Sequence, residues 1–315
     1  MSRRTFIHAS ILERIGGTPL IQLRRMAPAN GARILLKLES ENPTGSMKDR
    51  MALAMIEAAE KDGRLKPGGG VVEYTGGSTG VSLSLICAVK GYLLDIVTSD
   101  AFSTEKRKHT KALGATLTLI ESVGGGMDAT LTRNMIEAAR QIQERKGSFW
   151  TDQLKNADQL AAYTKMADEI WEQTGGAIDA FVQSVGTAAS VRGTGERLRA
   201  KKPGVRIVAV EPAESAVLSG GKSGSHKIEG VGAGFVVPLW KPEAIDEIAT
   251  VSTAEAMAMS RRLAREEGLF AGTSTGANIV AALKVAEKLG AGATVVTVLC
   301  DTGIKYLSTD LYKDV

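Results

Sequence analysis

The sequence predicts an α/β protein whose mostly parallel sheets are covered by helices on both faces. Short runs of β-branched and aliphatic residues alternate with longer stretches in which apolar residues recur at helical spacing. Such alternation is typical of βαβ units, because a crossover helix connects neighbouring parallel strands. With 315 residues, 43% of them hydrophobic and 23% charged, the chain can form two domains or one large one.

Strands and helices alternate along most of the chain. Each predicted strand is a short run rich in Val, Ile, Leu or Thr, and each predicted helix carries an apolar face. We expect strands at residues 34–38, 70–74, 94–97, 116–120, 180–182, 206–210 and 294–299. We expect helices at residues 51–59, 82–90, 104–113, 127–143, 158–171, 188–198, 254–266 and 277–288.

Two loops follow predicted strands and lead into predicted helices. The first is Thr75-Gly76-Gly77-Ser78-Thr79-Gly80, and the second is Gly186-Thr187-Ala188-Ala189-Ser190. Ligands of parallel sheets bind outside the carboxyl ends of the strands, where unpaired N–H groups of helix N-termini can hold an anion. Either loop alone would also fit an ordinary strand-to-helix turn, because glycine is common there.

One lysine has an unusual place in the sequence. Lys48 follows a Pro-Gly turn and lies where the loop gives way to the predicted helix at 51–59. Most lysines are solvated charges on flexible stems, but this placement would hold an amine still at the start of a helix. A fixed amine together with a phosphate-binding loop indicates pyridoxal phosphate (PLP) as the cofactor.

Two other phosphate-binding motifs fail at specific positions. Gly-Lys-Ser at 221–223 looks like the end of a P-loop, but Ala216 stands where the first glycine is required, and Gly224 follows where a helix should begin. Gly-Val-Gly-Ala-Gly at 230–234 opens like a dinucleotide fingerprint, yet the last glycine is missing and no clear strand precedes it. An NTPase and a dehydrogenase are therefore weaker alternatives.

Charge and cysteine content narrow the class of protein. The formal charge is +4, and basic clusters occur at Lys106-Arg107-Lys108 and at residues 197–202. Both clusters lie on predicted helices with mixed charge and few aromatic residues, so we expect solvated faces and no nucleic-acid site. Cys87 and Cys300 lie in buried-looking runs, which argues against disulfides.

The sequence also argues against a membrane protein and a metalloprotein. Residues 1–4 lack the apolar segment of a signal peptide, and no apolar run is long enough to span a bilayer. We therefore expect a cytoplasmic protein. His8, His109 and His226 share no metal-ligand spacing with each other or with the cysteines, so we expect surface histidines and no metal site.

Motifs spread over nearly the whole chain resemble one enzyme family. They are Gly-Gly-Thr-Pro-Leu at 16–20, Asn-Pro-Thr-Gly-Ser-Met-Lys-Asp-Arg at 42–50, Lys-Ile-Glu-Gly-Val-Gly-Ala-Gly-Phe at 227–235, Ala-Gly-Thr-Ser-Thr-Gly at 271–276 and Tyr-Leu-Ser at 306–308. In this order they resemble cysteine synthase (O-acetylserine sulfhydrylase) and its relative cystathionine β-synthase, of PLP fold type II, the fold of the tryptophan synthase β subunit.

The resemblance implies an architecture and a cofactor site. It implies a homodimer of chains with two α/β domains, each a mostly parallel sheet flanked by helices. The smaller, mobile domain would span residues 44–147, and the larger would combine residues 1–43 and 148–315. PLP would lie in the cleft between them.

The resemblance also implies roles for individual residues. Lys48 would bind the cofactor covalently and then act as the base at the substrate Cα. The phosphate would be held by Gly186, Thr187, Ala188, Ala189 and Ser190. Ser274, with Thr275 as a near alternative, would face the pyridine nitrogen. The substrate carboxylate would be bound by Thr75, Gly76, Ser78 and Thr79 with help from Gln153, for which a solvated loop amide is the other interpretation.

Two loops and one cysteine depart from the family pattern. The first loop usually reads Thr-Ser-Gly-Asn-Thr-Gly, with its asparagine on the 3′ oxygen of the cofactor, and here Gly76 and Ser78 replace the serine and the asparagine. We expect Ser78 to reach that oxygen directly or through water. The phosphate loop usually reads Gly-Thr-Gly-Gly-Thr, and its alanines restrict the backbone while keeping the N–H donors. Cys300 replaces a common proline near the pyridine ring, and we expect a buried thiol without a catalytic role.

The reaction implied by the resemblance is β-replacement on an activated serine. We expect O-acetylserine and sulfide to give cysteine and acetate. Cystathionine β-synthase activity, or another β-replacement or β-elimination on serine or O-phosphoserine, is the alternative, because Thr-Lys-Met-Ala-Asp-Glu-Ile at 164–170 resembles that enzyme. An alternative of another class is a PLP-binding pseudoenzyme or regulatory partner protein. Serine acetyltransferase is a candidate partner that the sequence itself does not reveal.

Overall fold

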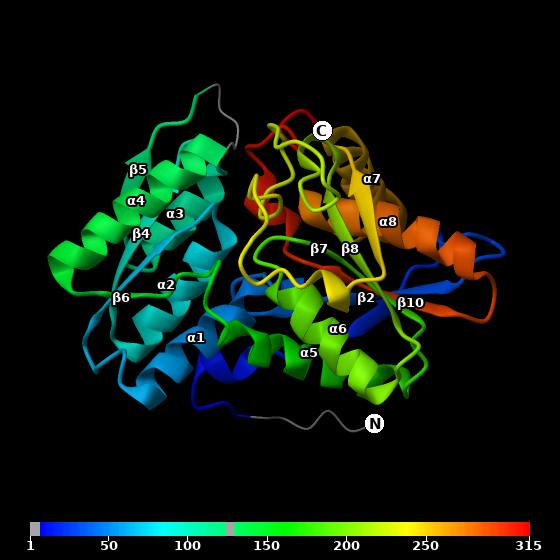
Figure 1. Cartoon of the computed structure of the whole chain (residues 1–315), viewed down its shortest axis with the longest axis horizontal. Coiled ribbons are helices and arrows are strands. Elements are labelled where there is room, and N and C mark those ends of the chain that lie inside the picture. The colour runs from blue at the N-terminus through cyan, green and yellow to red at the C-terminus, as the bar shows by residue number, and fades with distance from the viewer. Residues whose placement is uncertain (1–6, 124–128) are drawn as a thin grey trace.

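A computed structural model describes residues 7–123 and 129–315 as two α/β units that lie side by side (Figure 1). One unit is built around a four-stranded sheet and the other around a six-stranded sheet. Both sheets are mainly parallel and both are flanked by helices, so the predicted fold class is confirmed.

The six-stranded sheet has the order β1-β2-β10-β7-β8-β9. β1 (Leu20–Gln22) pairs antiparallel with β2 (Arg33–Leu38), and all other neighbours are parallel. The remaining strands are β7 (Ala180–Ser184), β8 (Arg206–Pro212), β9 (Glu247–Val251) and β10 (Thr294–Leu299). Since β10 pairs with β2 along its whole length, this sheet joins the two ends of the chain.

Helices cover both faces of the six-stranded sheet (Figure 1). α5 (Gln159–Thr174) and α6 (Ala189–Lys201) cover one face, and α7 (Thr253–Glu267) and α8 (Thr273–Leu289) cover the other. Alternate residues of each buried strand point to opposite faces. In β7, Phe181 packs with α5 and α6, while Ala180 and Val182 pack with α7 and α8.

The four-stranded sheet has the order β5-β4-β3-β6, with every pair parallel. Its strands are β3 (Gly70–Tyr74), β4 (Leu93–Ser99), β5 (Thr116–Ile120) and β6 (Phe149–Trp150). α1 (Lys48–Asp62) and α2 (Ser78–Lys90) pack into the apolar cluster on one face, and α4 (Ala129–Lys146) packs on the other. α3 (Thr104–Ala112) connects β4 to β5.

α1 contributes to the cores of both units. Met51 and Met55 pack with α5 and α6 of the larger sheet, while Ala52 and Ile56 pack with α2 of the smaller one. Because α1 begins at Lys48, that lysine lies at the junction of the two units.

All predicted strands and helices occur in the structure, with ends that differ by a few residues. Residues 127 and 128 of the predicted helix at 127–143 lie outside the described residues. The sequence did not predict β1, β6 or β9, which are short strands at sheet edges. Their half-exposed residues lack the apolar runs that identify buried strands. Short 3₁₀ segments occur at Ile11–Arg14, Glu39–Glu41, Ala213–Ser215, Pro242–Ala244 and Gly303–Tyr306.

Candidate active site

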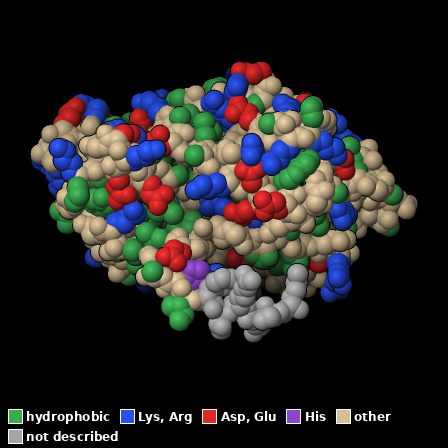
Figure 2. Space-filling view, turned by 90° about the horizontal axis from the view of Figure 1, so that it is seen from below, with side chains coloured by type: hydrophobic (Ala, Val, Ile, Leu, Met, Phe, Trp, Pro, Cys, Tyr) green, Lys and Arg blue, Asp and Glu red, His purple; other side chains and the backbone are tan. Residues whose placement is uncertain are grey.

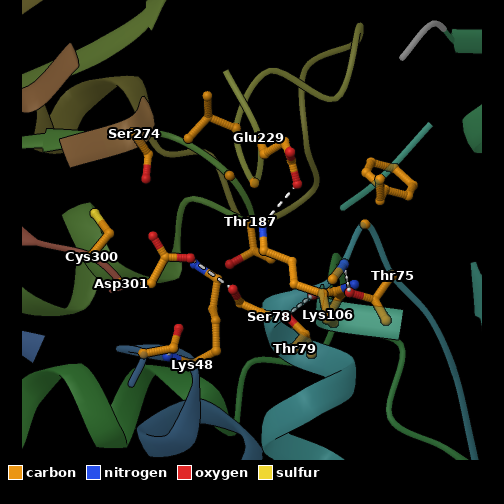
Figure 3. Close-up of a pocket in the computed structure, with 18 of the residues that line it drawn as sticks. Lys48, Thr75, Ser78, Thr79, Lys106, Thr187, Glu229, Ser274, Cys300 and Asp301 are labelled. Carbon is orange, nitrogen blue, oxygen red and sulfur yellow. Dashed lines mark hydrogen bonds and ion pairs between the residues drawn. The ribbon is translucent and has the colours of Figure 1, made fainter. Parts of the chain in front are cut away.

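A cavity lies between the two units, at the carboxyl ends of β3, β7 and β10 (Figure 3). It encloses about 930 Å³, including its open mouth. This is the edge at which the glycine-rich loops were expected to bind a ligand. Nine of the predicted site residues line it: Lys48, Thr75, Gly76, Ser78, Thr79, Gln153, Gly186, Thr187 and Ser274.

The backbone around Lys48 is fixed by contacts with both units. Met47 donates its N–H to the carbonyl of Cys300 at 2.8 Å, which joins the start of α1 to the end of β10. Asp49 is buried, and its carboxylate accepts a hydrogen bond from Ser82 Oγ of α2 at 2.6 Å. Lys48 is therefore held on both sides by residues that do not move freely.

The amine of Lys48 has no hydrogen-bond or ion-pair partner among the residues that the structure describes. Burial lowers the pKa of Lys48, because a charged ammonium loses solvation, and the nearby Cys300 and Asp301 only oppose this shift. The N-terminus of a helix also disfavours a positive charge. The site therefore favours a neutral amine, the form that acts as a nucleophile or base.

The loop after β3 presents N–H groups to the cavity. α2 begins at Ser78, and within the described ranges no acceptor pairs with the N–H groups of Gly76, Ser78 or Thr79. Gly77 has a φ of 144° and donates its N–H to Thr75 Oγ1 at 3.0 Å. A side chain at such a φ is strained, so glycine shapes this turn. Unpaired N–H groups at a helix start can hold an anion.

Gln153 holds this loop in place. Its Nε2 donates to the carbonyl of Tyr74 at 2.7 Å, and its Oε1 accepts from Thr79 Oγ1 at 2.8 Å. Its backbone N–H donates to the carboxylate of Glu73 at 2.9 Å, and burial raises the pKa of Glu73 to about 8. Gln153 is only 7% exposed, so the interpretation as a solvated loop amide is wrong.

The loop after β7 reaches the cavity with its first two residues. Gly186 and Thr187 line the wall, whereas Ala188, Ala189 and Ser190 form the turn and the first residues of α6 and do not line it. No acceptor in the described parts of the chain pairs with the N–H groups of Gly186, Thr187 or Ala188. A second set of free donors therefore lies at the start of α6.

Local packing explains the shape of this second loop. A Cβ at Gly186 would collide with the carbonyl of Gly230, so only glycine fits there. Ala188 adopts the left-handed region with a φ of 68° and precedes α6 directly. Thr187 donates its hydroxyl to Gln159 Oε1 at 2.9 Å, which ties the loop to α5.

The start of α8 supplies a hydroxyl to the cavity. Ser274 lines the wall near Cys300 (Figure 3). Thr275 is fully buried, and its Oγ1 accepts a hydrogen bond from Cys300 N at 3.0 Å. Of the two hydroxyls considered from the sequence, Ser274 is thus the one that faces the cavity. Cys300 is buried as expected, and burial raises the pKa of its thiol.

Lys106 enters the cavity wall from α3, although the sequence predicted a solvated basic cluster. Its side chain is 3% exposed, with Nζ 2.7 Å from Glu229 Oε2 and 3.9 Å from the ring centre of Tyr306. The prediction is wrong for Lys106, because a carboxylate of the other unit takes the place of solvent. Its sequence position carries a signal for this: a cation in the first turn of a helix opposes the helix dipole, so a partner is expected.

A second polar contact crosses the cavity. Ser78 Oγ donates to Asp301 Oδ2 at 2.8 Å (Figure 3). The hydroxyl of Tyr306 donates to the same oxygen at 2.8 Å. Sequence reasoning did not assign Asp301 or Tyr306 to the site. The only signal for Asp301 in the sequence is its place just after a buried strand.

The two glycines of the first loop make room for side chains from the start of α3. A Cβ at Gly76 would lie 2.6 Å from Phe102 Cε1, and a Cβ at Gly77 would collide with the stem of Lys106. The missing side chain at Gly76, which departs from the family pattern, therefore leaves room for the ring of Phe102.

The chemistry of this donor set fits the cofactor predicted from the sequence. The cavity offers a free amine, unpaired N–H groups at the starts of two helices and a hydroxyl on the wall between them. An aldehyde can react with the amine, and a phosphate can be held by N–H groups at a helix start.

Comparison with known proteins decides the family. Residues 11–301 match the family model described as pyridoxal-phosphate dependent enzyme. The chain belongs to the family of pyridoxal-phosphate dependent enzymes. The cofactor predicted from Lys48 and the loops is thereby confirmed, and so is the prediction that the protein is an enzyme.

Individual relatives of this enzyme agree with the motif-based resemblance. It is 44% identical to a cysteine synthase of Staphylococcus aureus over 306 residues, which are 96% of this chain and 97% of the relative. A crystal structure of cysteine synthase from Entamoeba histolytica is 43% identical with a TM-score of 0.91, over 99% of this chain and 93% of that one. A structure of O-ureido-L-serine synthase is 38% identical with a TM-score of 0.92, over 98% and 96%. The resemblance to cysteine synthases and to PLP fold type II is confirmed.

Other described residues concern the expectations about membrane spans, metal ligands, surface charge and histidines. No described helix is long and apolar enough to cross a membrane, and no cluster of three potential metal ligands occurs among those residues. On the face shown in Figure 2, basic and acidic side chains are interspersed. His226 is buried, with Nε2 3.0 Å from the carbonyl of Gly232, so the expectation of a surface residue is wrong for this histidine.

Proposed function

We propose that this enzyme catalyses β-replacement on an activated serine, with O-acetyl-L-serine and sulfide as substrates and L-cysteine and acetate as products. The observation that carries the proposal is the unpaired Lys48 amine, which faces a cavity with two sets of free N–H donors. The similarity to cysteine synthases over almost the entire chain supports the choice of substrates.

The cofactor would be held by residues from three helix starts. Lys48 would bind its aldehyde carbon, the N–H groups of Gly186, Thr187 and Ala188 would hold its phosphate, and Ser274 would face its ring nitrogen. Ala189 and Ser190 would support the phosphate from the first turn of α6. When bound, pyridoxal phosphate supplies the electron sink that makes the substrate Cα proton acidic.

The substrate would be oriented by the loop after β3. The free N–H groups of Gly76, Ser78 and Thr79, together with the hydroxyl of Thr75 just after β3, would donate hydrogen bonds to its carboxylate. Gln153 would act by fixing Thr79, since its own amide is already paired. Lys48, released from the cofactor, would take the proton from Cα, and its lowered pKa suits this because a neutral amine is needed.

The hydroxyl of Ser78 would contribute to cofactor binding in a specific way. It donates its proton to Asp301, so its lone pairs remain for a donor on the ligand. An asparagine at this position would instead offer an N–H group. The site therefore favours a protonated group next to Ser78.

We further propose that residues 44–147 form a smaller, mobile domain against a larger domain of residues 1–43 and 148–315, except that β6 (Phe149–Trp150) pairs with β3 and belongs to the sheet of the smaller domain. Support comes from the two separate sheets and from the Lys106–Glu229 and Ser78–Asp301 contacts, which span the cavity through side chains alone. Breaking these contacts would open the cavity, and forming them would exclude water from the reacting atoms.

On family resemblance we also propose a cytoplasmic homodimer, with serine acetyltransferase as a candidate partner. Sedimentation of the purified protein, alone and with that partner, tests the assembly.

A second candidate function is β-replacement with a larger nucleophile. The similarity to O-ureido-L-serine synthase favours this second function, because the product in that enzyme's name carries a group larger than the thiol of cysteine. Homocysteine, giving cystathionine, belongs to the same class of acceptor. A pseudoenzyme is disfavoured by the free amine of Lys48.

One experiment separates these functions. The cofactor absorbance of the purified protein is followed after addition of O-acetyl-L-serine, L-serine or O-phospho-L-serine, and sulfide or homocysteine is then supplied. We expect O-acetyl-L-serine to change the spectrum and sulfide to restore it with release of L-cysteine. Lys48→Ala should remove the lysine-bound chromophore and lower turnover by at least about 100-fold, the smallest effect usual for a lost general base. Lys61→Ala, on the exposed end of the same helix, is the matched control and should behave as wild type. No response to any of the three donors would favour the pseudoenzyme.

A further inference from the structure

A second cavity lies next to the candidate active site, on the other side of Phe102 and Glu229, which line both. It encloses about 850 Å³, including its open mouth. Its walls come from the two units: Asp100 and Arg107 from the segment around α3, and Thr273 and Ser308 from the larger unit. Nothing in the proposed reaction uses this space.

Arg107 is a cation without a carboxylate partner in this cavity. Among the described residues its guanidinium makes a single hydrogen bond, from NH2 to Thr104 Oγ1 at 3.3 Å, and no carboxylate oxygen lies within 4.0 Å. Its Nε is buried and has no partner. Within the described chain no acceptor therefore pairs with Nε, and the NH1 and NH2 groups, whose single bond there is the one to Thr104, offer N–H donors to an acceptor in the cavity.

Asp100 is the complementary case. Its Oδ1 accepts hydrogen bonds from Ser99 Oγ at 2.9 Å and from Ser122 N at 2.7 Å, and in the described chain no Lys or Arg pairs with it. These hydrogen bonds lower the pKa of Asp100, which therefore carries a full negative charge at neutral pH.

The other charges of the cavity are already neutralised. Glu229 pairs with Lys106, and Asp310 pairs with Lys227 and Lys313. His226 is buried, which lowers its pKa and favours the neutral ring. One positive and one negative group thus remain in the same space without forming a pair with each other.

We propose that the second cavity binds a free α-amino acid as its zwitterion, with the carboxylate on Arg107 and the ammonium group on Asp100. A guanidinium offers the two parallel donors that a carboxylate accepts, and a carboxylate accepts from an ammonium group. The hydroxyl-bearing residues Thr104, Thr273 and Ser308 on the wall suit a polar or small side chain.

The position of the site gives the bound amino acid contact with both units. Arg107 lies one residue after Lys106, whose ion pair with Glu229 separates the two cavities. A bound amino acid would therefore contact both units, as the Lys106–Glu229 pair already does. It would favour the arrangement in which the two proposed domains are closed over the active-site cavity.

Calorimetric titration tests the proposal. The cofactor-loaded enzyme is first reduced with borohydride, which fixes the cofactor and prevents amine exchange at Lys48. L-Serine, L-glutamine and L-methionine are then titrated, with N-acetyl-L-serine and L-serinamide as analogues that lack the ammonium charge or the carboxylate. We expect at least one amino acid to bind, and both analogues of serine to bind at least tenfold more weakly than L-serine if L-serine is that ligand.

Variants locate the binding. Arg107→Gln and Asp100→Asn should each weaken it at least tenfold, and Arg107→Lys should weaken it less than Arg107→Gln. Arg133→Gln is the matched control, because Arg133 makes the same contact to a threonine three residues earlier but lies outside the cavity, and it should bind as wild type. Thermal melting with and without ligand shows that each variant is folded. Failure of all three amino acids to bind, or binding that Arg107→Gln and Asp100→Asn leave unchanged, would overturn the proposal, and so would equal binding of N-acetyl-L-serine.

Discussion

Gly76→Ser, which restores the residue usual at this position in the family, is expected to destabilise this protein through packing alone. The φ of Gly76 is not in the left-handed region, so the backbone accepts a side chain. The new Cβ would lie 2.6, 2.9 and 3.2 Å from three atoms of the Phe102 ring, which is buried against β3, β4 and α4. Overpacking of this kind costs about 1–3 kcal/mol. For a chain of this length, that corresponds to a melting temperature lower by about 2–5 °C.

The control for this variant is another glycine with ordinary φ. Gly204 has no neighbouring atom within 4 Å of an added Cβ, so Gly204→Ser should leave stability unchanged or raise it slightly. Urea unfolding measures both variants, alone and combined with Phe102→Leu. The smaller side chain should relieve the clash, so that Gly76→Ser costs at least about 1 kcal/mol less in the Phe102→Leu background. The reasoning is refuted if Gly76→Ser unfolds as Gly204→Ser does, or if Phe102→Leu brings no relief.

Three further predictions concern buried side chains. Gln153→Leu should raise the KM for the amino-acid donor about tenfold, the effect of losing roughly one hydrogen bond, because Thr79 loses its partner. Steady-state kinetics check this, with Gln141→Leu at an exposed position as the control. Lys305 is buried without a partner for Nζ, and desolvation lowers its pKa to about 8 from 10.5, so its ammonium form destabilises the fold below pH 8. Lys305→Met should therefore be more stable than wild type by up to about 3 kcal/mol near pH 7, and this difference in stability should shrink between pH 8 and 10.5. Urea unfolding of both proteins across that range checks the prediction. A difference that stays constant with pH would contradict it. Cys87 is buried, with a pKa raised to about 12, and Cys300 is also buried with a raised pKa, so both thiols should react with Ellman's reagent far more slowly in the folded protein than in urea. Rapid labelling in the native state would contradict this, and it would show opening of the cavity wall for Cys300 or of the smaller unit's core for Cys87.

The sequence located the parts of the site that depend on local structure. A glycine-rich segment after an apolar run predicts a strand, a turn and a helix start, because only neighbouring residues are involved. The loop with Gly76 and Gly77 and the loop with Gly186 were found in this way, as was the placement of Lys48 at the start of α1. Short edge strands such as β6 escaped, since two residues carry no periodic pattern.

Contacts between residues far apart in the sequence could not be predicted from such local patterns. Ser78 meets Asp301 across 223 positions of sequence, and Lys106 meets Glu229 across 123. In the sequence, only its place in the first turn of α3 distinguishes Lys106 from its solvated neighbour Lys108, and that place does not identify the partner. Only the approach of the two sheets buries the first and leaves the second exposed.

By itself, therefore, the sequence determined the fold class, the cofactor, the placement of Lys48 at a helix start and the loops that can bind anions. The tertiary structure decided which of two adjacent hydroxyls, Ser274 or Thr275, faces the cavity, and which charges lie unpaired beside it. The physical reason is that helix starts and turns are set by interactions within a few residues, whereas burial and charge pairing depend on surfaces that meet only when the chain has folded.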